Sequence, residues 1–190
     1  MIETIKDFLP DEEFGYFAME AMQFPHYAPC DFESDRNEAD GSIDTYGEHL
    51  RTVDVYKHQL MFQALIFSRK NLSCLATDFF VKQSRIINVI ADLLDVKKWW
   101  VIRVNCTVGE DKPYVGTFHT DFGEPYLLEN TKTAILYLNT NNGGTQFDDK
   151  DGPIIKSKAN TLVKFPCNTP HAGIHCTDAK LRYVMNLNYE

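Results

Sequence analysis

The sequence predicts an α+β protein in which an antiparallel sheet or barrel is backed by helices. Apolar residues at helical spacing occur only in the first half of the chain, and short strand-like segments separated by turn residues fill the second half. The 190 residues, 44% hydrophobic and 24% charged, are typical of one soluble globular domain. We therefore expect a single domain over residues 1–190, with flanking helices and strands in 1–97 and a β-rich core in 98–190.

The first elements are a short strand within residues 1–9 and a helix that follows it. Pro10 and the three acidic residues after it favour a helix N-terminus, where negative charge suits the helix dipole. Pro25 and Pro29 are expected to end this helix. Its apolar residues follow helical spacing: Phe14, Phe17, Ala18, Ala21 and Met22.

Residues 31–48 form an acidic segment with seven Asp or Glu residues and one base, Arg36. Gly41 and Gly47 favour a loop here. Two interpretations remain open. The segment is either a solvated loop, which is the commoner role of a charge run, or a flap over the substrate entrance. A flap of this charge predicts a positively charged substrate.

Three elements are expected between the acidic segment and the β-rich half. Residues 51–56 alternate like a strand, and 59–70 fit either a helix or a strand, with a helix favoured. A long helix is predicted over 78–94, with Asp78 as its N-cap. Its apolar stripe consists of Phe79, Ile86, Ile90, Leu93 and Leu94.

The second half reads as a series of strands. We expect a strand over 99–106, a loop over 109–114, a strand over 133–139 and a turn at 141–144. Short strands follow at 154–156, 160–166, 171–176 and 181–189. In the last of these, polar side chains alternate with apolar ones, as expected where one face of a sheet lines a site: Arg182, Val184, Asn186 and Asn188 against Tyr183, Met185, Leu187 and Tyr189.

Charge and cysteine content narrow the possible functions. The net charge of −8 argues against nucleic-acid binding through phosphates, which needs clustered Lys and Arg. No apolar run approaches the length of a membrane span, and the N-terminus lacks the features of a signal peptide. The five Cys are odd in number and lack metal-type spacing, so free thiols in a cytoplasmic protein are expected.

One pattern points to chemistry. In an extended segment, residues i and i+2 point to the same side, so His119 and Asp121 can direct an imidazole and a carboxylate to one point. His171, in the context Pro-His-Ala-Gly, would complete two His and one carboxylate. That set holds Fe(II) on one face and leaves the opposite positions open. His175 is the competing choice for the second imidazole.

Four segments of the C-terminal half carry a family resemblance in their order along the chain. They are His119–Asp121, then Ile135–Asn139 with Gly143–Phe147, then Leu162–Pro166 with Pro170–Gly173, and finally Leu181–Val184. In these segments the chain resembles the Fe(II)- and 2-oxoglutarate-dependent oxygenases, and among them the prolyl-4-hydroxylase-like branch. Thr145 departs from the pattern, because prolyl hydroxylases often carry Glu after the two glycines.

The resemblance implies a double-stranded β-helix (jelly-roll) core with flanking N-terminal helices. It implies Fe(II) on His119, Asp121 and His171, with 2-oxoglutarate and O2 as co-substrates. Arg182 would hold the far carboxylate of 2-oxoglutarate through a bidentate fork, assisted by the Tyr137 hydroxyl. The implied reaction is hydroxylation, with succinate and CO2 as co-products and a peptide or protein residue favoured as substrate.

Two other functions remain open from the sequence. The first is a hydrolase that uses the same ligands on Zn. The second is a non-catalytic jelly-roll binding module. Arg182 separates the oxygenase from the hydrolase, because a hydrolase has no need of a carboxylate anchor at that position.

Overall fold

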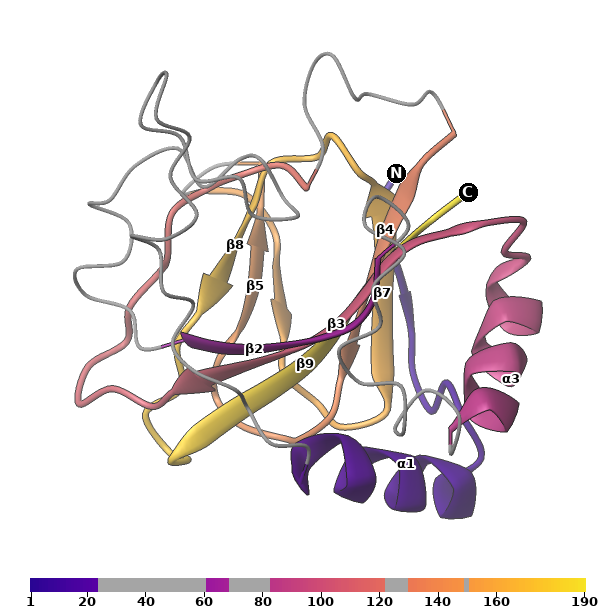
Figure 1. Cartoon of the computed structure of the whole chain (residues 1–190). Helices are drawn as coiled ribbons and strands as arrows, with labels where there is room; N and C mark the ends of the chain where they lie inside the picture. The colour runs from indigo at the N-terminus through magenta and orange to yellow at the C-terminus, as the bar shows by residue number, and fades with distance from the viewer. Residues whose placement is uncertain (24–60, 69–82, 122–129, 149–150) are drawn as a thin grey trace, which may run out of the picture.

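In a computed structural model, the chain is built mostly from antiparallel sheets with few helices (Figure 1). The structure describes residues 1–23, 61–68, 83–121, 130–148 and 151–190. Its elements in chain order are β1 (Glu3–Ile5), α1 (Asp11–Gln23), β2 (Met61–Ser68), α3 (Ser84–Leu94), β3 (Trp99–Val108), β4 (Lys132–Tyr137), β5 (Gly144–Phe147), β6 (Ile154–Lys156), β7 (Thr161–Pro166), β8 (His171–Ile174) and β9 (Leu181–Tyr189).

The larger sheet has six antiparallel strands in the order β1-β7-β4-β9-β3-β2. Its longest pairing joins β3 to β9, with Val108 opposite Leu181 at one end and Trp99 opposite Tyr189 at the other. Because β1 and β2 come from the N-terminal half, both halves of the sequence build this sheet. The smaller sheet has three antiparallel strands in the order β6-β5-β8.

The main core lies between the helices and one face of the six-stranded sheet (Figure 1). Helix α1 contributes Phe17, Ala18 and Ala21; Ala21 lies four and three residues after the other two, so the three share one face of the helix. Helix α3 adds a stripe of isoleucines, which belongs to the same apolar core as strand residues such as Leu136 and Leu187. The apolar residues that alternate along β9 therefore face the main core, as the sequence pattern predicts.

The opposite face of the six-stranded sheet meets the three-stranded sheet. A smaller apolar cluster lies there, with Phe147 from β5 packed edge-on against Phe165 from β7 at 4.9 Å between ring centroids. The polar residues of β9 are on this face, and Arg182, Asn186 and Asn188 are all buried. A protein interior that buries this much polarity next to an apolar cluster is the place to look for a ligand site.

The structure corrects several sequence predictions. Residues 61–68 form strand β2, not the favoured helix, because β2 pairs along its length with β3. Strand β5 was not expected separately from the turn before it. Helix α3 begins at Ser84, later than predicted, and Leu93 is exposed rather than part of its buried stripe. The acidic segment 31–48, the strand predicted at 51–56 and the proposed N-cap Asp78 lie outside the described residues.

Among the described residues, neither helix has the length and apolar character needed to cross a membrane.

Candidate active site

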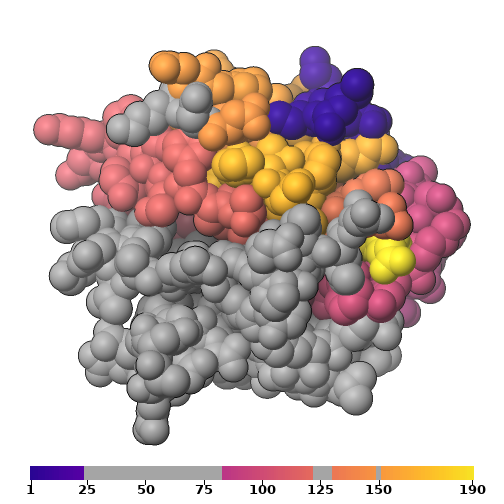
Figure 2. All heavy atoms as spheres, turned by 90° about the horizontal axis from the view of Figure 1, so that it is seen from above, coloured from indigo at the N-terminus to yellow at the C-terminus, as the bar shows by residue number. Residues whose placement is uncertain are grey.

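The first imidazole is positioned by a segment that runs beside β8. Residues 109–121 form isolated bridges to β8 at Val115–Ile174 and at His119–His171. At the second bridge the backbone N–H of each histidine donates to the carbonyl of the other, at 3.0 and 2.9 Å. Figure 2 shows salmon-coloured residues of this part of the chain bordering the gold-coloured C-terminal residues. The pairing places two histidines, far apart in sequence, directly opposite each other.

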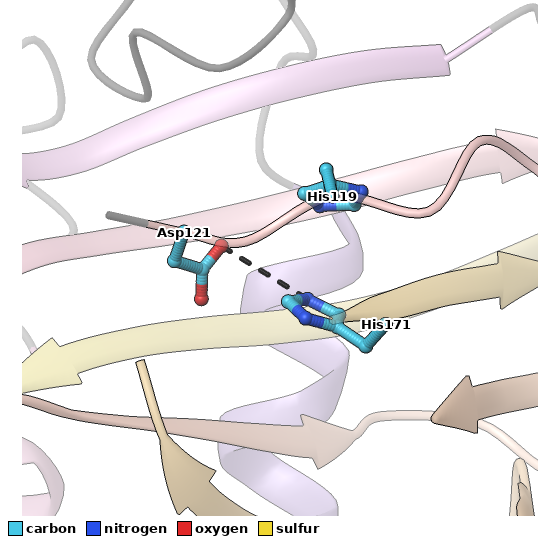
Figure 3. A group of neighbouring side chains, drawn as sticks. All are labelled: His119, Asp121 and His171. Carbon is cyan, nitrogen blue, oxygen red and sulfur yellow. Dashed lines mark ion pairs between the residues drawn. The ribbon is translucent and has the colours of Figure 1, made fainter. Parts of the chain in front are cut away.

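Three potential metal ligands converge at this bridge. One ligand atom each from His119, Asp121 and His171 lies within 4.8 Å of the others. The two imidazole centroids are 4.6 Å apart, and His171 Nε2 lies 4.0 Å from Asp121 Oδ1 (Figure 3). Among the described residues this is the only such group of His, Cys and acidic side chains. The i, i+2 spacing and the distant histidine thus meet at one point.

The histidine rings are fixed by backbone carbonyls. His119 Nδ1 lies 3.0 Å from the Thr117 carbonyl oxygen, and His171 Nδ1 lies 3.0 Å from the Thr169 carbonyl oxygen. A carbonyl oxygen only accepts, so each Nδ1 carries the proton and donates it. In the neutral form of each ring, Nε2 is then the nitrogen that can bind a cation, which is the usual arrangement of metal-bound histidines.

The two oxygens of Asp121 have different surroundings. Oδ2 accepts a hydrogen bond from the Thr133 hydroxyl and another from Asn188 Nδ2 at 3.0 Å. Asn188 Nδ2 also donates to Thr133 Oγ1 at 2.9 Å. Oδ1 is 3.6 Å from an Arg103 guanidinium nitrogen and faces His171. The carboxylate therefore presents Oδ1 to the histidines and Oδ2 to the sheet.

The electrostatics keep the donor set ready for a cation. Burial alone would raise the pKa of Asp121, but attraction to His171 and Arg103, with smaller contributions from His119 and the Thr133 hydrogen bond, lowers that pKa to about 2. Desolvation of the His119 ring by the surrounding protein lowers its pKa, and repulsion from His171 lowers it further, to about 4. At neutral pH Asp121 is therefore ionised and His119 is neutral, the states that bind metals.

Arg182 is a buried cation without an acidic partner among the described residues. Its Nε donates to Ser157 Oγ at 3.1 Å, and its Nη2 donates to the Gly144 carbonyl at 2.9 Å. Burial lowers the pKa of the guanidinium, partly offset by Tyr137 and Cys176. A buried charge is costly unless it is paired, so this guanidinium fits an anion that arrives from outside the chain.

Two glycines lie beside Arg182. A Cβ on Gly143 would lie 2.5 Å from the Ile174 carbonyl oxygen and 3.1 Å from Arg182 Cδ. A Cβ on Gly173 would lie 3.8 Å from Arg182 Nη1. Gly173 is two residues from His171 along β8, and such residues are roughly 7 Å apart on one side of a strand. Arg182 thus lies beside the residue of β8 that is on the same side of the strand as His171.

Tyr137 lies beside Arg182. The guanidinium carbon is 5.8 Å from the centre of the Tyr137 ring. The hydroxyl is within hydrogen-bonding distance of Thr145 Oγ1 at 2.9 Å and the Ile155 carbonyl at 3.2 Å. Burial raises the pKa of this phenol, so it stays protonated and keeps a hydrogen to donate. Thr145, at the position where the family pattern often has Glu, is thus a partner of the tyrosine.

His175 does not join the three ligands. Its Nδ1 lies 3.2 Å from the Val108 carbonyl oxygen and 4.0 Å from Glu110, and its ring packs edge-on against Tyr114. The residues that the sequence reasoning missed are Thr133 and Arg103. No sequence signal marked Thr133, because its place beside Asp121 follows from the strand register, in which it lies opposite Asn188.

Comparisons with known proteins agree on the fold. No family model and no curated protein matches the sequence. A prolyl-4-hydroxylase from Pseudomonas putida is 14% identical, with a TM-score of 0.52 over 100% of this chain and 92% of that one. A Trichoplax adhaerens prolyl hydroxylase, solved with a hypoxia inducible factor peptide, is 15% identical, with a TM-score of 0.57 over 99% of this chain and 82% of that one.

A third similar structure is an enzyme of another kind. The non-heme, alpha-ketoglutarate-dependent epimerase SnoN from nogalamycin biosynthesis is 13% identical, with a TM-score of 0.55 over 100% of this chain and 77% of that one. The chain therefore has the fold of 2-oxoglutarate- and iron-dependent oxygenases, and the resemblance predicted from the sequence is confirmed at that level. Because hydroxylases and an epimerase share the fold, it does not by itself select the reaction.

Proposed function

We propose that this protein is an Fe(II)- and 2-oxoglutarate-dependent oxygenase that hydroxylates a residue of a peptide or protein, with succinate and CO2 as co-products. The observation that carries the proposal is the presence of two sites that each contact both sheets: a two-His, one-carboxylate cluster and a buried guanidinium without an acidic partner among the described residues. A Zn hydrolase accounts for the first site but leaves the second without a role.

The metal cluster fits a divalent first-row ion. Two imidazole nitrogens and one carboxylate oxygen converge, and three protein ligands leave coordination positions for small molecules. His119 is neutral and Asp121 is ionised at neutral pH, so neither has to lose a proton before it binds. His119, Asp121 and His171 would hold the iron, which supplies the activation of O2 and the oxidation of 2-oxoglutarate when bound.

Arg182 and Tyr137 would bind the far carboxylate of 2-oxoglutarate. The guanidinium retains Nη1 for an incoming anion, since its described hydrogen bonds use Nε and Nη2. The Tyr137 hydroxyl can turn from Thr145 to the carboxylate. Charge-assisted bonds of this kind would hold one end of the co-substrate and leave its keto-acid end free for the metal.

Apolar side chains around the cluster would exclude water from the reaction. The Phe165 ring packs edge-on against His171 at 4.9 Å between centroids, and the Phe147 ring lies 6.2 Å away on the same histidine. Exclusion of water by these rings would strengthen the interactions of Arg182 and Asp121 with their ligands and suppress side reactions of a strong oxidant. In this proposal the two sheets are those of a double-stranded β-helix and residues 1–190 form one domain.

Turnover of 2-oxoglutarate tests the proposal. Purified protein with Fe(II), O2 and 2-oxoglutarate should form succinate, and peptide pools from a proteome digest should raise that rate and show a mass gain of one oxygen. Asp121→Ala should abolish succinate formation, because the cluster loses its only negative ligand. Zn in place of Fe(II) should give none.

The result against the proposal is specific. A folded protein that binds Fe(II) yet forms no succinate with or without the pools would exclude the oxygenase. Succinate formation stimulated only by a small-molecule pool would retain the oxygenase and reject the peptide substrate.

A further inference from the structure

We infer that Thr133 and Asn188 are positioning residues that determine which oxygen of Asp121 binds the metal. The two side chains hold Oδ2 against the sheet, so that Oδ1 alone is presented to the ion. The inference rests on the proposed metal site and concerns the binding mode of its carboxylate ligand.

The hydrogen bonds form a closed triangle with one consistent direction. The Thr133 hydroxyl donates to Asp121 Oδ2, and Asn188 Nδ2 donates both to that oxygen and to Thr133 Oγ1. Each donor therefore has a defined acceptor, and the Asn188 amide nitrogen uses both of its hydrogens. With two donors on Oδ2, its lone pairs are committed and a metal bond there would displace a hydrogen bond.

The sheet itself fixes the triangle. Thr133 on β4 and Asn188 on β9 are directly opposite in the strand register, and both side chains are fully buried. Neither residue depends on a flexible loop for its position, because the flanking backbone is paired on both sides of β9. The triangle is thus a rigid support for the Asp121 carboxylate.

The other oxygen, Oδ1, has an ion-pair contact with Arg103 and faces His171. No described residue donates a hydrogen bond to Oδ1, which faces His171 Nε2 at 4.0 Å and lies 3.6 Å from Arg103. Binding through Oδ1 alone uses one coordination position. Binding through both oxygens would use two, and would leave one fewer for small molecules. The triangle therefore favours a single-oxygen ligand and keeps the metal open.

Metal affinity of the folded, full-length protein tests the inference without any turnover. Co(II) is the probe, followed by calorimetry and by its visible spectrum. Thr133→Val and Asn188→Leu should each raise the Kd for Co(II) by roughly 10–100-fold, the usual cost of losing a partner of a metal ligand. Thr133→Ser keeps the hydroxyl, so it should restore the wild-type affinity and spectrum.

Thr131→Val is the matched control. Thr131 is a buried threonine two residues from Thr133, and its hydroxyl has no hydrogen-bond partner among the described residues. Its replacement should leave the Co(II) affinity unchanged. Equal affinity in wild type, Thr133→Val and Asn188→Leu would overturn the inference and leave the proposed function intact. A folded wild-type protein that binds no Co(II) would overturn both.

A crystal structure of the Co(II)-loaded wild-type protein decides the question even if the variants do not fold. We expect Oδ1 roughly 2.0–2.2 Å from the ion, by analogy with other carboxylate–metal distances, with both hydrogen bonds to Oδ2 retained. An ion bound by Oδ2, or by both oxygens equally, would contradict the inference.

Discussion

At the scale of single residues, Arg182 says most about function because its burial is unfavourable without a ligand. The guanidinium is removed from water, and its described partners are a serine hydroxyl and a backbone carbonyl rather than a carboxylate. A residue kept at a cost to stability is expected where a ligand repays it. Removal of Arg182 should therefore separate stability from binding.

We expect Arg182→Met to weaken 2-oxoglutarate binding by on the order of 2–5 kcal/mol, because a charge-assisted pair is lost. The thermal stability of the ligand-free protein should be little changed or higher, since an unpaired buried charge is removed. Calorimetric binding and thermal unfolding measure the two effects. Tyr137→Phe, as the comparison, should weaken binding far less. Equal 2-oxoglutarate affinity in wild type and Arg182→Met would remove Arg182 from the site.

Tyr189 offers a test of the core at alkaline pH. Its buried hydroxyl has no hydrogen-bond partner among the described residues, and burial, with a smaller effect of Glu3, raises its pKa to about 12. The unfolded phenol ionises near pH 10, so its contribution to stability is complete below pH 10 and is lost as pH rises from 10 to 12.

Tyr189→Phe should therefore be at least as stable as wild type at pH 7 and lose less stability between pH 10 and 12. Urea unfolding at both pH values measures the difference, with Tyr16→Phe, an exposed tyrosine, as the control. A Tyr189→Phe protein that is clearly less stable at pH 7 would mean that the hydroxyl has a partner.

At the scale of elements, Asn160 joins the N-terminal segment to the sheet. Its side chain accepts from the Leu9 backbone N–H at 2.9 Å and donates to the Leu9 carbonyl at 2.7 Å. Its own N–H donates to the Tyr137 carbonyl at 3.1 Å, and its φ of 59° lies in the left-handed region that asparagine tolerates. Asn160, which immediately precedes β7, thus holds the connection between β1 and α1 in place.

Asn160→Ala should lower the free energy of unfolding by on the order of 2–4 kcal/mol, from two lost buried hydrogen bonds and the strain of a positive φ. Asn160→Gly loses the same hydrogen bonds but not the backbone conformation, so it should be less damaging than alanine. Chemical denaturation of the three proteins measures the order. A glycine variant less stable than the alanine variant would contradict this explanation.

The elements also show what the sequence can and cannot predict. Strands β3, β7 and β9 alternate or carry continuous apolar runs and were predicted close to their observed bounds. Apart from Gln63, residues 61–67 are apolar and follow neither the helical nor the strand period clearly, and pairing with β3 decides that they form a strand. Strand β5 begins at Gly144, a residue typical of turns, and its pairing with β6 and β8 decides that it forms a strand. Only glycine fits there, because a Cβ would lie 2.4 Å from the Ile155 carbonyl oxygen.

The candidate site likewise contains one part that the sequence predicts and another that it does not. His119 and Asp121 share a side of an extended segment because of their spacing, so their convergence is a local property that the sequence contains. The meeting with His171 depends on a backbone bridge that no spacing reveals, and it was expected only through the family resemblance. The contacts of Thr133 and Arg103 with Asp121 depend on sheet register and packing, which a single sequence does not specify.

At the scale of the whole molecule, the six-stranded sheet separates the main apolar core from the candidate active site. One face packs against α1 and α3 in the main apolar core, and the other carries the polar residues of β9 and faces the three-stranded sheet. His119 and Asp121 lie more than 60 residues before Arg182 in the sequence, yet the candidate metal site and the guanidinium both contact this second face. The arrangement predicts that metal and 2-oxoglutarate bind next to each other and favour each other's binding.

Calorimetric titration of 2-oxoglutarate into the Fe(II)-loaded protein, without O2, tests this most directly. We predict one binding site per chain, with an affinity that falls strongly when Fe(II) is omitted and also falls in Asp121→Ala and in Arg182→Met. Binding of 2-oxoglutarate with the same affinity with and without Fe(II), or in the folded Asp121→Ala and Arg182→Met variants, would contradict the shared site.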